Sequence, residues 1–305
     1  MSELALGTVQ LGLPYGISNT HNIPDQLSAK RLLSGSLDQH FTTWDTAPHY
    51  GDAEKKIGIY LKSNPNSHVD IVTKIPFFQD DSHYLEKVKT SINHSLSALN
   101  QTSLYGVLFH HYEQYYQNKD LVNPFLNNLK TTHIIQKMGV SIYSPDNLDT
   151  ILNITDIDII QIPFSIFDQR LLSNDYLQRL VDQNIDIHVR SIFLQGLLFL
   201  NPETLPPFFQ SVKKELRQLH QIAKDHCIPL AKLAIGFVKK TPSISKIILG
   251  VGSLSELEEN AAYHQDGISE NLYREFLNLF SSIDPKILDP RSWPKNHISQ
   301  REAVT

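Results

Sequence analysis

Residues 41–62 read FTTWDTAPHYGDAEKKIGIYLK and place two kinds of secondary structure around one short polar loop. The first four residues are aromatic or β-branched, which predicts a strand that reaches Asp45. In the loop that follows, a proline and a glycine, both common in turns, bracket His49 and Tyr50. The apolar residues of 53–62 then recur at helical spacing. This stretch predicts a strand, a tight loop and a helix in one unit.

The same alternation recurs along the whole chain. Strands that alternate with helices pair in parallel through helical crossovers. Eight such units favour a closed (β/α)8 TIM barrel, typically about 250 residues long, over a doubly wound open sheet. The predicted strands are 4–7, 41–44, 71–74, 105–109, 137–140, 157–161, 185–189 and 247–250. The predicted helices are 27–40, 53–62, 84–99, 124–136, 147–152, 176–182, 212–225 and 256–263, with extra helices at 230–239 and 270–280.

The chain shows no linker that would divide it. No Pro-, Gly- or Ser-rich stretch separates two halves of its 305 residues. We therefore expect a single barrel domain over residues 1–305. Residues 283–305 contain three prolines and predict an extended C-terminal strap over this barrel.

Composition and charge exclude several classes of function. Hydrophobic residues make up 41% of the chain, enough for a large core, and the net charge of −5 includes no basic block for nucleic acid. No apolar run is long enough to span a bilayer, and the first residues lack the features of a signal peptide. A single cysteine, Cys227, is typical of a cytoplasmic protein. No metal-binding motif is present, and the sequence leaves the oligomeric state open.

Four chemically capable side chains are predicted to meet at the C-terminal ends of the strands, where TIM barrels carry their active sites. Asp45 ends the second strand, Tyr50 lies on the loop after it, and Lys74 ends the third strand. The fourth strand ends in His110 and His111. Because side chains alternate along a strand, His110 shares a face with smaller residues and is the better candidate for the barrel mouth.

These four side chains fit proton transfer to a carbonyl oxygen. A tyrosine pKa of about 10 falls when an ammonium lies nearby, and Asp45 would keep Lys74 charged and in place. His110 could orient the carbonyl by a hydrogen bond, while a cofactor delivers hydride. Two alternatives stay open: a purely structural Asp45–Lys74 ion pair, and a Schiff-base lyase or isomerase that uses Lys74 as its nucleophile.

Around these residues the sequence resembles the aldo-keto reductases over about residues 4–260. DTAPHYG at 45–51 is similar to the DTAxxYG signature of that family. Further matching segments follow the family's order: GTVQLG at 7–12, TK at Lys74, an apolar run ending in His110, GVS at 139–141, IIQIPFS at 159–165 and ILGVGSLSELEEN at 248–260. The resemblance implies a catalytic tetrad of Asp45, Tyr50, Lys74 and His110, with Tyr50 as general acid in reduction and base in oxidation.

The resemblance also implies a bound nicotinamide dinucleotide. Ser141 and Gln161 would hold the carboxamide, and Glu259 and Asn260 would contact the adenine. Independently, the loops after strands seven and eight of such barrels commonly bind phosphate, and small residues with free N–H groups suit an anion. The expected cofactor contacts are Gly7, Thr8, Asp45, Ser141, Gln161, Arg190, Ser191, Gly196, Gly250, Gly252, Ser253, Glu259 and Asn260.

Three positions depart from the family pattern. Glu256 stands where an arginine often binds the 2′-phosphate of NADPH, and residues 250–260 contain no Lys or Arg. Because a carboxylate repels a phosphate, NADP(H), which the resemblance implies, and NAD(H) both stay open. Ile142 replaces the asparagine that usually follows GVS. Arg190 stands where an aromatic residue often stacks on the nicotinamide.

The sequence therefore predicts an NAD(P)H-dependent oxidoreductase that reduces an aldehyde or ketone to an alcohol, with sugars and sugar derivatives among the candidate substrates. The alternative is a catalytically weak barrel that binds a nicotinamide nucleotide and acts through a partner. Aromatic and polar side chains near the mouth supply the expected substrate contacts. These are Tyr15, His49, Tyr50, Phe77 and His110, with Trp293 as a residue that could close the site.

Overall fold

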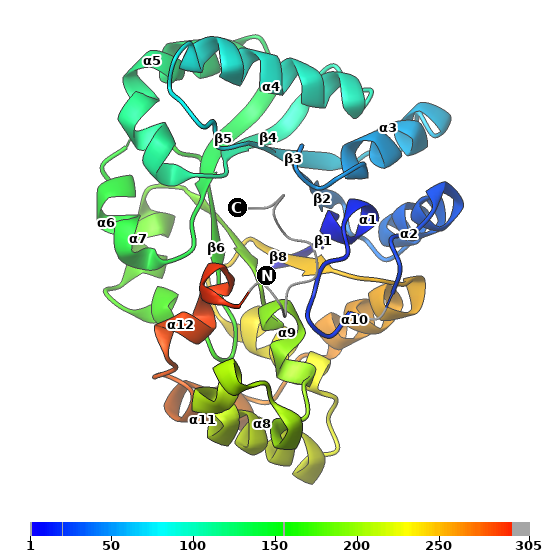
Figure 1. Cartoon of the computed structure of the whole chain (residues 1–305), viewed down its shortest axis with the longest axis vertical. Coiled ribbons are helices and arrows are strands. Elements are labelled where there is room, and N and C mark those ends of the chain that lie inside the picture. Colours follow the sequence, from blue (N-terminus) through cyan, green and yellow to red (C-terminus); the bar gives the residue numbers. More distant parts are fainter. Residues whose placement is uncertain (1, 20, 155, 295–305) are drawn as a thin grey trace.

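The computed structural model describes residues 2–19, 21–154 and 156–294. Its eight strands pair in chain order into a closed barrel, and every pair is parallel (Figure 1). This confirms the predicted TIM barrel and excludes the open sheet. The strands are β1 (Glu3–Gly7), β2 (Thr43–Asp45), β3 (Asp70–Ile75), β4 (Leu104–Phe109), β5 (Ile135–Ser141), β6 (Ile159–Pro163), β7 (Asp186–Arg190) and β8 (Lys246–Gly250).

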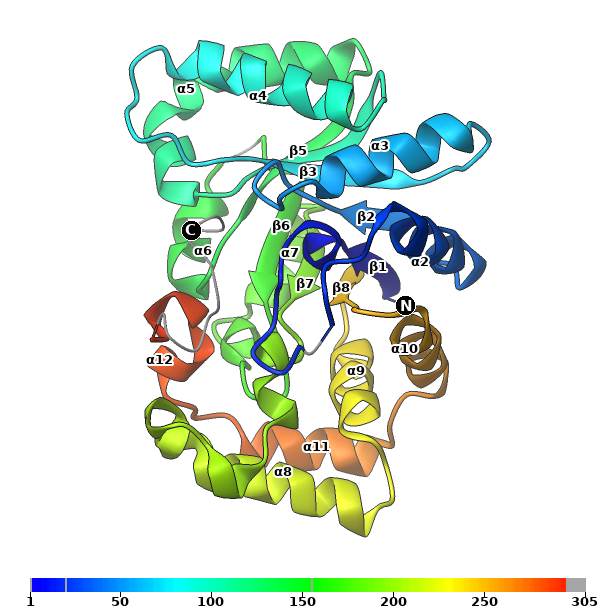
Figure 2. The same ribbon diagram turned by 45° about the vertical axis from the view of Figure 1, so that its right-hand side comes forward.

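Helices surround the strands, as Figures 1 and 2 show from two directions. They are α1 (Val9–Gly12), α2 (Gln26–Asp38), α3 (Ala53–Ser63), α4 (Tyr84–Ala98), α5 (Tyr112–Thr131), α6 (Leu148–Ile151), α7 (Tyr176–Asp182), α8 (Lys213–Asp225), α9 (Leu230–Lys240), α10 (Leu254–Asp266), α11 (Glu270–Leu279) and α12 (Pro285–Leu288). In both views α4 and α5 lie at one end of the molecule, and α8 and α11 lie at the other.

Alternation along the strands decides which side chains face the interior of the barrel. The Trp44 ring points outward, and its Nε1 donates a hydrogen bond to Ser36 Oγ on α2 at 2.9 Å. Val72, Leu108 and Ile159 instead form a small buried cluster of their own inside the barrel. Because strand side chains alternate, the residues two positions further along face the same way at the C-terminal end. Those residues are Lys74, His110 and Gln161.

The helix predicted at 124–136 is wrong at both ends. In the structure α5 begins twelve residues earlier and ends at Thr131, and β5 already begins at Ile135. Pro124 looked like a helix start, yet it lies inside the helix. An interior proline costs about 3 kcal/mol. Several buried side chains along α5, each of which stabilises by roughly 1.5–3 kcal/mol, outweigh that cost.

The segment predicted as an extended strap is partly helical. Residues 285–288 form α12, and Pro290–Ser292 form a 3-10 turn. Both begin with a proline after an aspartate whose side chain accepts a backbone hydrogen bond, an arrangement that starts a helix rather than an extended run. The rest of the strap, 295–305, lies outside the described residues. Within the part of the chain that the structure describes, no helix is long and apolar enough to cross a membrane.

Candidate active site

The four predicted catalytic side chains come together around one buried ion pair. Lys74 Nζ donates to Asp45 Oδ2 at 2.7 Å and to the carbonyl oxygen of Thr46 at 3.0 Å. The same ammonium lies 5.0 Å from the centre of the Tyr50 ring. The rings of Tyr50 and His110 meet edge to face, with their centroids 6.5 Å apart. The ends of β2, β3 and β4 thus bring all four residues to one place.

A second pair of predicted residues extends this network. Gln161 Nε2 donates to Asp45 Oδ1 at 2.7 Å, so both oxygens of the carboxylate are occupied. Ser141 Oγ in turn donates to Gln161 Oε1 at 3.2 Å. Ser141, Gln161 and Lys74 are all at most 1% exposed. The network therefore forms the floor of the site and fixes the position of Asp45.

Burial dominates the electrostatics of the site. It raises the pKa of Tyr50 well above its ordinary value, and the charge of Asp45 raises it further. Burial lowers the pKa of Lys74, against the opposing effect of Asp45, and lowers the pKa of His110 well below its ordinary range. The expected lowering of the Tyr50 pKa by Lys74 is therefore not seen here. At neutral pH, Tyr50 holds its proton and His110 is an uncharged hydrogen-bonding group.

The Tyr50 loop is held by close backbone packing. Gly51 has a left-handed φ of +58°, and a Cβ on it would lie 2.3 Å from the carbonyl oxygen of Gly12. A Cβ on Gly12 would lie 1.9 Å from the carbonyl oxygen of Tyr50. Lys56 on α3 adds a polar anchor, because its Nζ donates to Leu11 O at 2.7 Å and to Pro24 O. Only glycines allow the two loops to approach this closely.

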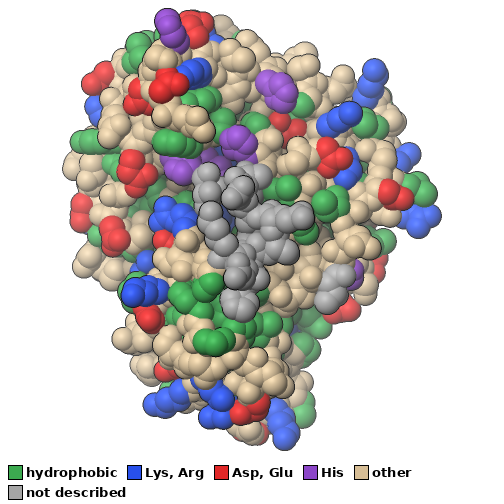
Figure 3. All heavy atoms as spheres, in the orientation of Figure 1, with side chains coloured by type: hydrophobic (Ala, Val, Ile, Leu, Met, Phe, Trp, Pro, Cys, Tyr) green, Lys and Arg blue, Asp and Glu red, His purple; other side chains and the backbone are tan. Residues whose placement is uncertain are grey.

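A cavity of about 1350 Å³ opens at the C-terminal end of the barrel. This is larger than the roughly 300–1,000 Å³ of a typical small-ligand site, as expected for two ligands side by side. Tyr50 and His110 line it, together with the ends of β1, β7 and β8 and the segment around Trp293. On the face shown in Figure 3, histidine side chains gather near the centre, toward the side of α4 and α5.

The loop after β7 has an unusual backbone conformation. Ser191, Leu194, Gln195 and Gly196 all have positive φ, between 44° and 96°. Such conformations are costly for residues other than glycine and persist where the surroundings enforce them. Two N–H groups are used inside the loop, because Leu194 N donates to Ser191 O at 2.8 Å and Gly196 N donates to Phe193 O at 2.9 Å. The loop forms part of the cavity wall.

Three glycines on the β1 and β8 side of the cavity are covered by neighbouring side chains. A Cβ on Gly250 would lie 2.5 Å from Gln10 Oε1, and one on Gly252 would lie 2.5 Å from the His21 ring. A Cβ on Gly7 would lie 3.1 Å from Ile248 Cγ2. A larger residue at Gly250 or Gly252 would therefore displace Gln10 or His21, which themselves line the cavity. The cavity volume, with walls from both the β7 and the β8 sides, fits a dinucleotide.

Glu256 has a structural role that the sequence did not reveal. Its Oε2 accepts from Gly252 N at 2.7 Å, and its Oε1 lies 3.1 Å from His21 Nε2. Ser253 Oγ accepts from Glu256 N at 3.2 Å, so this pair caps the N-terminus of α10. The Ser253 hydroxyl is thereby used within the protein, and a carboxylate occupies the helix end that an anion would otherwise reach.

The expected contacts divide into those that line the cavity and those that do not. Among the expected substrate contacts, Phe77 is 48% exposed and packs against the His111 ring, and His49 also stands outside the lining. Four further expected residues are not in the cavity wall: Ser141, Gln161 and Lys74, which are buried below it, and Ser253. The expected residues that line it are Gly7, Thr8, Tyr15, Asp45, Tyr50, His110, Arg190, Ser191, Gly196, Gly250, Gly252, Glu259, Asn260 and Trp293.

Comparison with known proteins identifies the family to which the chain belongs. The model of the aldo/keto reductase family matches residues 3–276, which is most of the chain. The chain belongs to the aldo/keto reductase family. This aldo-keto reductase is accordingly an NAD(P)H-dependent oxidoreductase, and members of its family act on small carbonyl compounds.

Several relatives resemble this aldo-keto reductase over most of its length. L-Galactose dehydrogenase of Arabidopsis thaliana is 27% identical over 82% of each chain. D-threo-Aldose 1-dehydrogenase of a Pseudomonas species is 22% identical over 90% of this chain and 96% of its own. NADH-specific methylglyoxal reductase of Escherichia coli is 26% identical over 72% and 77%. A holo aldo-keto reductase structure from Bacillus halodurans has the same fold, with a TM-score of 0.74 at 21% identity over 91% of each chain.

Sequence reasoning missed a group of lining residues in the aldo-keto reductase. The segment after α1 supplies Gly16, Ser18, Asn19 and His21, and Tyr143 and Arg291 approach from two other loops. The Ile17 N–H donates to Gln195 O at 2.8 Å, which joins the β1 loop to the β7 loop across the mouth. The unusual length of the β1 loop was the available signal. Over the described residues, no cluster of His, Cys, Asp and Glu is arranged to hold a metal ion.

Proposed function

We propose that this aldo-keto reductase reduces an aldehyde or ketone to an alcohol, with Tyr50 as the proton donor. The observation that carries the proposal is the edge-to-face pair of Tyr50 and His110 in one cavity, above the Lys74–Asp45 ion pair. A nicotinamide ring, when bound, supplies the hydride to the carbonyl carbon. Sugars and sugar derivatives are the favoured substrates, because two relatives are sugar dehydrogenases by name.

Each side chain has a separate task in this mechanism. His110 is neutral, so one ring N–H can donate to the carbonyl oxygen and orient it. Tyr50 keeps its proton until negative charge develops on that oxygen, and then donates it. Lys74 offers a positive charge near the resulting tyrosinate, and Asp45 and Gln161 hold that charge in place.

A Schiff-base mechanism on Lys74 has less support. Its ammonium is directed to Asp45 and to the Thr46 carbonyl, and the side chain is not part of the cavity lining. A nucleophilic lysine needs a free, uncharged amine that the substrate can reach.

Substitution of Tyr50 by phenylalanine tests the proposed proton donor. We expect kcat for carbonyl reduction to fall by roughly 100- to 10,000-fold, the contribution of general acid catalysis. Nicotinamide nucleotide binding, followed by fluorescence, should persist. Tyr60→Phe is the matched control, because Tyr60 packs on Trp44 outside the cavity, and it should stay active. Full activity in a folded, cofactor-binding Tyr50→Phe variant would contradict the proposal. Absence of turnover in the wild type would favour the alternative of a binding protein.

We further propose that NADH is preferred over NADPH. The carboxylate of Glu256 lies at the N-terminus of α10, and residues 250–260 contain no Lys or Arg to compensate a 2′-phosphate. Two unit charges 4 Å apart interact by about 1 kcal/mol in water and about 4 kcal/mol at an effective dielectric constant of 20. One curated relative is NADH-specific by name, which is consistent with this preference.

A paired titration tests the cofactor preference. The wild type should bind NADH at least 10-fold more tightly than NADPH, and Glu256→Gln should reduce that ratio by about 10-fold or more. Glu258→Gln is the matched control, since Glu258 lies on the same helix but not in the cavity lining. Tighter binding of NADPH by the wild type would show that another group, with His21 the nearest candidate, compensates the 2′-phosphate.

A further inference from the structure

Arg190 places a positive charge at the catalytic end of the cavity. It is the last residue of β7, and it lines the same cavity as Tyr50 and His110. Its charge lowers the pKa of both of these residues, which is consistent with its position near them. An aromatic residue often stands at this position in the family pattern, so the charge of Arg190 departs from that pattern.

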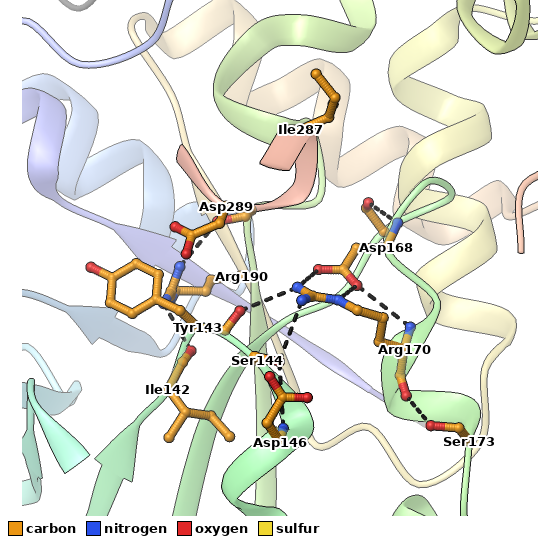
Figure 4. A network of polar contacts seen from close by, with 12 residues as sticks. Ile142, Tyr143, Ser144, Asp146, Asp168, Arg170, Ser173, Arg190, Ile287 and Asp289 are labelled. Atoms are coloured by element: carbon orange, nitrogen blue, oxygen red, sulfur yellow. Dashed lines mark hydrogen bonds and ion pairs between the residues drawn. The ribbon is translucent and has the colours of Figure 1, made fainter. Parts of the chain in front are cut away.

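The hydrogen bonds of Arg190 are all to neutral groups. Nη1 donates to Ser191 Oγ at 3.2 Å, and Nη2 donates to the carbonyl oxygen of Ile142 at 3.0 Å. The guanidinium carbon lies 4.6 Å from the centre of the Tyr143 ring. Figure 4 shows Arg190 and Tyr143 next to each other. A guanidinium has five N–H donors, so some of them remain available to a ligand. No carboxylate pairs with Arg190 among the residues that the structure describes.

Neighbouring arginines differ from Arg190 in this respect. Arg170 makes two hydrogen bonds to the buried carboxylate of Asp168, at 2.8 and 2.7 Å. Arg291 also lies beside the Tyr143 ring, at 3.9 Å, but it pairs with Asp289 at 2.7 Å. Lys74 is likewise neutralised by Asp45. Among the described arginines and lysines at this end of the cavity, Arg190 is therefore the one that forms no ion pair.

The direction of the Arg190 side chain separates it from the expected phosphate site. Its contacts with Ile142 and Tyr143 draw the guanidinium toward the loop after β5. The phosphate contacts expected from the sequence lie further along the chain, at Gly196 in the β7 loop and at Gly250 at the end of β8. A cofactor phosphate at those positions leaves the charge of Arg190 for a second ligand.

We propose that the substrate of this enzyme is a carbonyl compound that carries an anionic group, a carboxylate or a phosphate, and that Arg190 binds this group. A planar guanidinium fork matches both anions and binds them through paired, charge-assisted hydrogen bonds. In this position it would hold the anion while the carbonyl faces Tyr50 and His110. The inference rests on the proposed carbonyl reduction and names the class of its substrate.

Two matched pairs of aldehydes test the inference in the complete enzyme. One pair is 4-carboxybenzaldehyde and 4-formylbenzamide, and the other is D-glyceraldehyde 3-phosphate and D-glyceraldehyde. For at least one pair, kcat/KM should be 10-fold or more higher for the anionic member. A preference in the benzaldehyde pair indicates a carboxylate, and a preference in the glyceraldehyde pair indicates a phosphate. Arg190→Met should lower the anionic-to-neutral ratio by about 10- to 100-fold, mainly through KM. Arg190→Lys should restore part of the ratio.

Arg179→Met is the matched control, because it also removes a guanidinium that lies over a tyrosine ring, that of Tyr176, but one that pairs with Asp149 and lies outside the cavity lining. It should change the ratio by less than 3-fold. An unchanged ratio in Arg190→Met, or an equal loss in Arg179→Met, would overturn the assignment. Dissociation constants for NADH and NADPH, measured for each variant, separate any loss of cofactor binding from a loss of substrate binding.

Calorimetric binding distinguishes failure of this inference from failure of the proposed function. Wild type and Arg190→Met, each saturated with oxidised cofactor, are titrated with 4-carboxybenzaldehyde, 4-formylbenzamide and the two glyceraldehydes. If the wild type turns over no aldehyde, the proposed reduction fails. Arg190-dependent binding of an anionic member would still support the anion site, whereas equal affinities of wild type and variant would exclude it.

Discussion

His188 lies inside the barrel two residues before Arg190 on β7, and it is 1% exposed. Its Nε2 atom has no hydrogen-bond partner within the described residues. Burial lowers the pKa of this imidazole to about 3, although the charge of Asp186 opposes the effect. The folded protein therefore holds a neutral His188 at pH values where the unfolded chain, with a histidine pKa of about 6.5, takes up a proton.

This difference predicts a loss of stability in acid. Between pH 6.5 and about 3 the unfolded state binds more protons at His188, so the free energy of unfolding falls as the pH falls. At pH 5 the loss amounts to about 2 kcal/mol from this residue. Urea denaturation at pH 7.5 and at pH 5.0 measures the free energy of unfolding of the wild type and of His188→Leu. Between these two pH values the variant should lose about 2 kcal/mol less of this free energy than the wild type does.

The exposed histidine at the end of α8 provides the control for this measurement. His226→Leu should lose as much stability between the two pH values as the wild type does, because this side chain is exposed and its surroundings change little when the chain unfolds. Equal losses in wild type and His188→Leu would show that the buried imidazole does not set the acid sensitivity.

At the scale of elements, backbone packing of the β2–α3 loop sets the position of the proposed proton donor. Gly51 combines a left-handed φ with a backbone contact to Gly12, and Tyr50 precedes it directly. We expect Gly51→Ala to push the loop away from Gly12 and to move the Tyr50 hydroxyl. The displacement should lower kcat by 10-fold or more, since small misplacements of reacting groups cost about 100-fold. Steady-state kinetics together with thermal unfolding measure the effect.

Gly267 offers a matched comparison at the end of α10. It also has a positive φ, +66°, but a Cβ there would meet only Lys239 Cδ, at 3.8 Å. Gly267→Ala should therefore lose stability through backbone strain while kcat stays near that of the wild type. If both variants lose stability and both keep kcat, the position of Tyr50 does not depend on the packing of Gly51.

Element boundaries show where local sequence signals were sufficient and where they were not. Residues 41–62 carry a strand, a turn and an amphipathic helix, and β2 and α3 form there as predicted. At Pro124 the local signal for a helix start was strong, but packing along the whole of α5 overrode it. A local pattern is decisive when tertiary contacts favour the same conformation, as they do for β2 and α3.

On the scale of the whole molecule, closure of the barrel makes the site. β1 pairs with β8, which lies more than 200 residues later, and the loops after both strands line one cavity. Asp45 and Gln161 are 116 residues apart in the chain but share a 2.7 Å hydrogen bond. The alternation of strands and helices predicted that strand ends would meet, but it contained no information on which atoms would pair.

The sequence alone predicted the barrel and placed Asp45, Tyr50, Lys74 and His110 at or just after the C-terminal ends of its strands. Periodicity and strand parity act over a few residues, so they can be read without coordinates. Only the tertiary structure decided that Glu256 caps α10, that burial raises the pKa of Tyr50, and that Arg190 has no carboxylate partner among the described residues. These properties depend on burial and on distances between segments far apart in the chain, and both arise only when the barrel closes.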